Sequence, residues 1–223
     1  MNKYDLVSKI EKFAPLDTQD DWDNSGWIID NPDIVDVKKI MLALTVTDKV
    51  VEKARNKNCD MIVAHHPLFA VPLAFRDIQI YSSHTPTDKA LGGTTDTLLK
   101  HLGLVSNSIV EKYVRIVGFE NAISVSEFRN KLEKISNNVR LVNNNGVTEI
   151  KKIGFCAGSG SEFINSVDVD AFVTGDLKYH TAVETDKVIF DIGHYESEIL
   201  ILNEFKNILG INVEFSDEKS PFI

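Results

Sequence analysis

The stretch "DMIVAHHPLF", Asp60 to Phe69, decides more about the fold than any other part of the sequence. Its apolar run ending at Ala64 is typical of a buried strand, and two adjacent histidines follow at once. Neighbouring residues on a strand point to opposite faces, so His65 and His66 can share one site only if the chain leaves the strand there. Pro67 favours such an exit, because proline restricts the residue before it and has no N–H to donate to a ladder.

Strand-like and helix-like segments alternate on both sides of this stretch, which predicts an α/β fold. The alternation restarts near residues 106–110, so we expect two similar α/β lobes, each a mostly parallel mixed sheet with helices on its faces. The predicted first lobe combines residues 1–108 with 196–223, and the second lobe is residues 109–195. The spacing predicts one helix over 194–209, and the tail from Asn212 is expected to add an edge strand.

The composition excludes several classes of protein. The chain has 223 residues, 43% of them hydrophobic, and a net charge of −9, which argues against a nucleic-acid partner because phosphate binding needs clustered Lys and Arg. No run approaches the roughly 18 apolar residues of a membrane helix, and the first residues lack a signal-peptide layout. Cys59 and Cys156 lie in separate apolar stretches and are expected to be buried thiols. Together these features predict a cytoplasmic protein without a membrane partner.

Four of the six histidines follow predicted strands: His65, His66, His84 and His194. Ligands of α/β sheets bind beyond the carboxyl ends of the strands. Asp88 follows four residues after His84, in a predicted loop, and Glu198 follows four residues after His194, on the same helical face. Imidazole and carboxylate donors suit divalent metals, and the whole set suits two ions.

Each of these patterns has a plainer interpretation. An isolated pair of histidines is also expected where one ring packs in the core and the other faces solvent. Asp88 is also compatible with a helix or turn cap, and His194 with Glu198 is compatible with an exposed helix start. In "VTGDLKYH", His180 is either an acid or base near Asp176 or a surface histidine on a short helix. The "GSGS" run from Gly158 resembles an anion cradle before a helix, or a simple turn.

Six stretches carry a family resemblance: "WDNSGW", "CDMIVAHHPLF", "SSHTPTDKALGGTTDTLLKHLGL", "AGSGSEFI", "AFVTGDLKYHTA" and "DIGHYESE". In this order they resemble the Nif-three-like dinuclear-metal hexamer family, whose bacterial members are often named GTP cyclohydrolase I type two homologues. The resemblance covers nearly the whole chain. It implies the compact form of the family, with two α/β lobes, metals in the cleft between them, no inserted domain, and a toroidal homohexamer.

The resemblance also implies a set of site residues. The implied ligands of two divalent ions (zinc, manganese, iron, cobalt or nickel) are His65, His66, Asp88, His194 and Glu198. His84 and His180 match family histidines near the site and are assigned to substrate or proton handling. The chain departs from the family at Thr45, where Asp is common, and at Trp27, where Leu is more usual. Neither is a predicted ligand, but Thr45 is expected to affect the contacts behind the ligands, which tune metal choice.

Two classes of function follow from this site. The first is a metal-dependent hydrolase that acts on a nucleotide-like small molecule through a metal-activated water, either by GTP ring opening or by phosphoester hydrolysis. The alternative is a non-catalytic metal-binding, metal-delivery or regulatory interaction protein. A purely structural metal fits less well, because structural sites are usually closed, whereas these ligands follow strand ends.

Overall fold

The structure, a computed structural model, describes residues 1–222, which form two units with a sheet in each. Unit 1 combines Met1–Gly93 with Ile201–Lys219, and unit 2 combines Thr94–Leu200 with residues 220–222. The prediction of an α/β fold with two lobes is confirmed.

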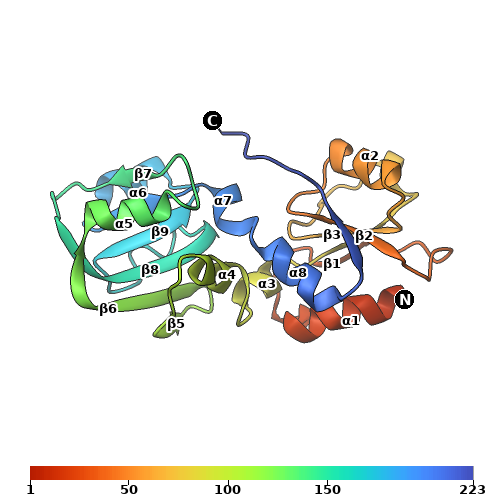
Figure 1. Cartoon of the computed structure of the whole chain (residues 1–223), viewed down its shortest axis with the longest axis horizontal. Helices are drawn as coiled ribbons and strands as arrows, with labels where there is room; N and C mark the ends of the chain where they lie inside the picture. Colours follow the sequence, from red (N-terminus) through yellow and green to blue (C-terminus); the bar gives the residue numbers. More distant parts are fainter. Residues whose placement is uncertain (223) are drawn as a thin grey trace. The chain divides into compact units, whose positions relative to one another are not determined.

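In the described residues of unit 1, five strands form a sheet in which all neighbours except one pair run parallel (Figure 1). Its order is β1 (Gly26–Ile29), β4 (Gln79–Ser82), β3 (Met61–Ala64), β2 (Lys39–Ala43) and β11 (Asn212–Phe215), with β1 antiparallel to β4. The helices of the unit are α1 (Lys3–Phe13), η1 (Leu16–Thr18), α2 (Asp48–Asn56), η2 (Leu73–Phe75), α3 (Thr85–Lys89) and α8 (Ile201–Leu209). The predicted edge strand at the tail is therefore present as β11.

The central strand β3 is buried along its whole length, because helices cover both faces of the sheet. On one face, Val51 of α2 packs with Ile62 of β3 in one apolar cluster. On the other side of the sheet α8 contacts β2 and lies beside α1 (Figure 1). Since β3 and β4 run parallel, their carboxyl ends lie at the same edge, and the residues that follow each strand are brought together there.

In the described residues of unit 2, six strands form a sheet in the order β5 (Ser108–Val110), β6 (Val114–Ser124), β8 (Glu149–Ser159), β9 (Ala171–Gly175), β10 (Val188–Asp191) and β7 (Arg140–Val142). Only β8, β9 and β10 of these described strands run parallel to one another, so this sheet is less parallel than the first. The helices are α4 (Thr94–His101), α5 (Val125–Leu132), α6 (Tyr179–Glu184) and α7 (His194–Glu198).

Alternation along the parallel strands of unit 2 separates two apolar layers. Phe155 and Phe190 face a cluster that includes Phe128 of α5. Helix α5 lies over the sheet in Figure 1. Phe172 and Ile189 face a second cluster. The loops that follow β9 and β10 therefore start from strands that are packed on both faces.

The predicted helix over 194–209 is divided in the structure. Helix α7 ends at Glu198 and belongs to unit 2, where it contacts α4, β8 and β9, whereas α8 begins at Ile201 and belongs to unit 1. The boundaries between the units also differ from the predicted ones after residues 108 and 195. Residues 94–108 belong to unit 2, because α4 packs on β6, β8 and α7.

Both cysteines are buried free thiols, as predicted. Across residues 1–222, every helix is too short or too polar to cross a membrane.

Candidate metal centre

The two adjacent histidines of unit 1 extend the ladder of β3 by two residues. The His65 backbone N–H donates to Ala43 at 3.2 Å, and the His66 N–H donates to Leu44 at 2.9 Å. Their ring centroids nevertheless lie only 5.0 Å apart, with the ring planes tilted by 42°. The two imidazoles therefore share one location instead of pointing to opposite faces of the sheet.

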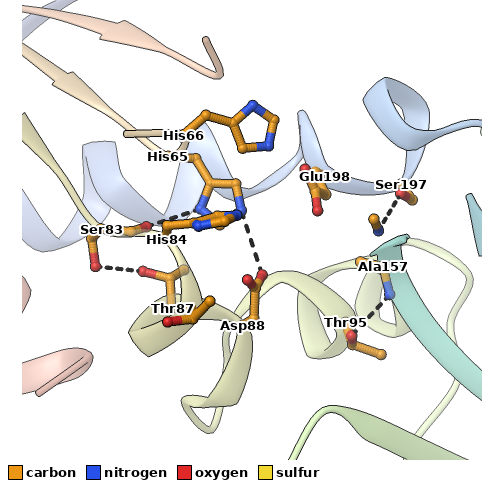
Figure 2. A network of polar contacts seen from close by, with 12 residues as sticks. His65, His66, Ser83, His84, Thr87, Asp88, Thr95, Ala157, Ser197 and Glu198 are labelled. Atoms are coloured by element: carbon orange, nitrogen blue, oxygen red, sulfur yellow. Dashed lines mark hydrogen bonds and ion pairs between the residues drawn. The ribbon is translucent and has the colours of Figure 1, made fainter. Parts of the chain in front are cut away.

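Each of these rings is held through its Nδ1 atom. Nδ1 of His65, a fully buried residue, donates to the carbonyl of Ser83 at 2.9 Å (Figure 2). Nδ1 of His66 lies 2.7 Å from Oγ1 of Thr45. Such contacts fix the ring orientation and assign Nε2 as the nitrogen that can bind a metal. Thr45 thus contacts the predicted ligand His66 at the nitrogen that would not face the metal. This is the kind of contact through which the sequence analysis expected Thr45 to act.

His84 and Asp88 flank the same group of rings. His84 follows β4 and precedes α3, and its ring centroid lies 5.2 Å from that of His65 and 5.5 Å from that of His66. Asp88 lies on α3 and not in the expected loop, because its N–H donates to the His84 carbonyl at 3.1 Å and closes a helical turn. That turn brings Oδ1 of Asp88 to 3.4 Å from Nε2 of His65 (Figure 2).

Asp23 contacts the candidate site, and the sequence reasoning did not single it out. Its side chain is fully buried and accepts hydrogen bonds from His84 Nδ1 at 3.0 Å, Ser25 Oγ at 2.7 Å and the Thr85 hydroxyl at 2.6 Å. Burial by itself raises the pKa of this carboxyl, but the hydrogen bonds from His84, Thr85 and Ser25 outweigh it and hold the pKa well below its usual range. The "WDNSGW" stretch contained the signal, an acidic residue inside a polar turn beside a strand.

In unit 2, His194 and Glu198 lie one turn apart on α7, as predicted. Nε2 of His194 is 2.9 Å from Oε2 of Glu198, and Nδ1 is 2.6 Å from Oδ2 of Asp176. Burial lowers the pKa of His194, but the two carboxylates, Glu198 first, outweigh it and raise the pKa to about 9. Asp176, which follows β9, is therefore the residue that orients this imidazole from behind.

A glycine at the end of β8 makes room for the Glu198 carboxylate. Gly158 has φ +67°, and a Cβ added there would lie 2.1 Å from Oε1 of Glu198. The Gly158 N–H donates at 2.9 Å to Oγ of Ser197, whose hydroxyl donates to the His194 carbonyl at 2.7 Å. The helix expected after "GSGS" is not formed, since residues 161–166 are turns. This glycine gives space to a side chain and does not begin an anion cradle.

His180 lies on α6, exposed to solvent, with its ring against Tyr179 at a centroid distance of 5.5 Å. Among the described contacts of unit 2, none joins it to His194. A cavity of about 140 Å³ opens beside His194 instead, and Asp176, Asp191 and Arg140 line it. Arg140 is paired with the buried carboxylate of Asp191.

The donors present fit divalent transition metals. Unit 1 offers imidazole nitrogens of His65, His66 and His84 within 4.8 Å of one another, with the Asp88 carboxylate beside them. Unit 2 offers the nitrogen of His194 and the almost fully buried carboxylate of Glu198. Imidazole with carboxylate is a donor set typical of zinc, manganese, iron, cobalt and nickel. The structure therefore contains candidate metal-binding groups, which the sequence predicted.

Comparisons with known proteins show the family to which the chain is similar. The model of the family Duf34/NIF3 (NGG1p interacting factor 3) matches residues 1–221. The "GTP cyclohydrolase 1 type 2 homolog" of Clostridium perfringens is 29% identical over 260 residues, covering 100% of this chain and 99% of the relative. "NIF3-like protein 1" of Drosophila melanogaster is 29% identical and covers 92% of this chain and 80% of that protein. The solved structure "Reduced HcgD from Methanocaldococcus jannaschii" has a TM-score of 0.85 at 28% identity, with 98% of both chains covered.

Proposed function

We propose, because this chain belongs to the Duf34/NIF3 (NGG1p interacting factor 3) family, that it is a dinuclear metal protein and a metal-dependent hydrolase of nucleotide-like small molecules. The proposed ligands are His65, His66 and Asp88 of unit 1 with His194 and Glu198 of unit 2. One observation carries the proposal. The imidazoles of His65, His66 and His194 are each held at Nδ1 by a neighbouring group, the arrangement typical of metal-ligating histidines.

When bound, two divalent ions would supply an activated water at neutral pH and would polarise a carbonyl or phosphoryl oxygen. The chain's own residues do the rest. The Asp88 and Glu198 carboxylates would offset the positive charge of the ions, and Asp176 keeps the His194 ring in place. His180, exposed on α6, keeps its proposed role in substrate or proton handling.

The cavity beside His194 bears on the substrate. At about 140 Å³ it is smaller than the roughly 300 Å³ at which ligand pockets begin, so it would hold part of a substrate and not a whole nucleotide. The name of the Clostridium perfringens relative points to GTP ring opening, and phosphoester hydrolysis is the other reaction that the donor set supports. In both cases the substrate would present an oxygen to the metals.

The alternative function is a metal-binding, metal-delivery or regulatory interaction protein without turnover. The family description, an interacting factor, favours it. We also propose that the chain forms a homohexamer in the cytoplasm, a state that native mass spectrometry would detect as six times the mass of one chain.

The test is the metal content per chain, measured by elemental analysis on protein purified without added metal or chelator. We expect about two metal equivalents per chain in the wild type and a loss of metal in the double variant His65→Ala/His66→Ala. The matched control is His101→Ala, which removes an exposed histidine of α4. A wild type that holds no metal and binds none when supplied would overturn the proposal. A hydrolytic rate lost in Glu198→Ala would support the enzyme, whereas partner binding that depends on metal without any turnover would support the alternative.

A further inference from the structure

The family resemblance assigns His84 to substrate or proton handling, but the surroundings of this histidine favour a different role. We propose that His84 supplies a third imidazole nitrogen to the ion held by His65 and His66, and that Asp23 is the positioning residue that presents it. This inference rests on the proposed metal function, and it adds a ligand and its support to the unit 1 group.

The three rings are close enough to meet at one ion. The ring centroids lie 5.0 to 5.5 Å apart, and one nitrogen of each ring lies within 4.8 Å of the others. On a tetrahedral ion, imidazole nitrogens about 2.1 Å from the metal are roughly 3.4 Å from one another. Small ring rotations would therefore bring all three nitrogens to an ion. In Figure 2 the ring of His84 lies against that of His65, on the side that faces Asp88.

The tautomer of His84 supports a ligand role. Its Nδ1 is bonded to the Asp23 carboxylate, an acceptor, so in the neutral ring Nδ1 carries the hydrogen and Nε2 carries the lone pair. The same logic holds for His65, whose Nδ1 donates to a carbonyl, and the Thr45 hydroxyl can accept from Nδ1 of His66. All three rings thus share the arrangement in which the outer nitrogen is anchored and the inner one can bind a metal.

Asp23 is built to hold one ring in one orientation. Its side chain is fully buried, and one oxygen accepts from His84 while the other accepts from Ser25 and Thr85. The Ser25 hydroxyl also accepts from the His84 backbone N–H at 2.9 Å, which fixes the main chain of the same histidine. A carboxylate behind an imidazole makes the ring a stronger donor to a metal. The cost of burying the Asp23 charge is offset by these hydrogen bonds.

A tryptophan beside the site offers an optical probe. Trp22 packs edge-on against the His84 ring, with centroids 5.6 Å apart, and its side chain is largely exposed. An ion bound through His84 would lie close to this indole, and Co²⁺ or Ni²⁺ would quench its fluorescence. The second tryptophan, Trp27, packs against Tyr4 and Tyr81 and supplies the background in a Trp22→Phe variant.

The experiment is a titration of the full-length chain with Co²⁺ alone, followed by the d–d absorption bands and by Trp22 fluorescence. His84→Ala should weaken one Co²⁺ site at least tenfold and shift its bands, because one nitrogen is replaced by water. His84→Gln, which keeps the size of the side chain, should do the same and replaces the alanine variant if that fails to fold. Asp23→Asn should weaken the same site by a smaller factor and also shift the bands.

A matched variant separates a ligand role from a general effect of losing a histidine. His101→Ala removes an exposed histidine of unit 2. It should keep the wild-type bands and affinity. If the wild type binds no Co²⁺, the proposed function itself fails. If the wild type binds Co²⁺ and His84→Gln leaves affinity and bands unchanged, the third-nitrogen inference is overturned while the proposed function stands.

Discussion

Oγ1 of Thr45 lies 2.7 Å from Nδ1 of His66, so a neutral hydroxyl contacts the outer nitrogen of this predicted metal ligand. The corresponding nitrogen of His84 is bonded instead to the carboxylate of Asp23. Removing the Thr45 contact should weaken metal binding without removing a ligand. Thr45→Val keeps the branched shape and is expected to weaken the affinity of the unit 1 group by about tenfold, the usual effect of losing an outer-shell partner. Competition with a chelator measures it. Thr45→Ser, which keeps the hydroxyl, should match the wild type, and an equal loss in both variants would contradict the explanation.

Gly158 allows a test of the space around Glu198. Alanine at this position is strained by the left-handed backbone and would also collide with the carboxylate. Gly146 has a nearly identical φ of +65° but no atoms within 4 Å of an added Cβ, so Gly146→Ala carries the backbone cost alone. The left-handed backbone should lower the free energy of unfolding of both variants by about 1–2 kcal/mol. Gly158→Ala should lower it further because of the collision, and it should also lose bound metal. Thermal unfolding and metal content together check this, and equal behaviour of the two variants would exclude the collision.

The buried phenol of Tyr81 predicts that stability depends on pH in the alkaline range. Burial, together with the neighbouring Glu11 carboxylate, raises the pKa of this phenol far above its ordinary value of 10. Above pH 10 the unfolded chain loses the proton while the folded chain keeps it, so stability present below pH 10 is lost as pH rises, by at most about 1.4 kcal/mol per pH unit.

Tyr81→Phe should therefore be less stable than the wild type at pH 8, because it lacks the 3.0 Å hydrogen bond to Glu11. At pH 11 this difference should shrink or reverse. Urea unfolding at the two pH values measures it, and Tyr179→Phe, at an exposed tyrosine, is the control. A difference that stays constant with pH would show that Tyr81 ionises normally.

The ion pair between the buried guanidinium of Arg115 and the partly exposed carboxylate of Asp96 is expected to be a main stabilising contact of unit 2. The guanidinium is fully buried and meets the carboxylate twice, at 2.8 and 3.1 Å. Asp96→Ala removes the compensating charge and should cost about 3 kcal/mol, the typical loss when a buried pair is broken. Lys152→Ala breaks the exposed pair with Asp168 and should change stability little. Similar losses in chemical denaturation of the two variants would contradict this account.

The sequence predicted what depends on short-range pattern. An apolar run that ends in "HH" located β3 and its two imidazoles, and the spacing of four residues placed His194 and Glu198 on one face of α7. Both results rest on the local geometry of strands and helices, which a few neighbouring residues determine. The family resemblance predicts that these residues belong to one site, and this grouping stays a prediction.

The sequence could not predict features that depend on distant contacts. Asp23 acquires its role from His84, 61 residues away, and nothing in its own turn indicates that partner. The break between α7 and α8 falls in the continuous apolar run of Ile199, Leu200 and Ile201, where helical periodicity gives no sign of an end. The chain passes from unit 2 to unit 1 at that point, and packing against two different sheets decides where each helix stops.

The return of α8 and β11 to unit 1 has a consequence for synthesis on the ribosome. Strand β11 pairs in parallel with β2, from Asn212 opposite Lys39 to Phe215 opposite Leu42. These partners are made about 170 residues apart, so β2 remains an open sheet edge while all of unit 2 emerges. Unit 2 can complete its sheet during translation, whereas unit 1 has to wait for the last helix and strand. A nascent chain stalled before residue 201 should therefore expose its amino-terminal half to chaperones and proteases.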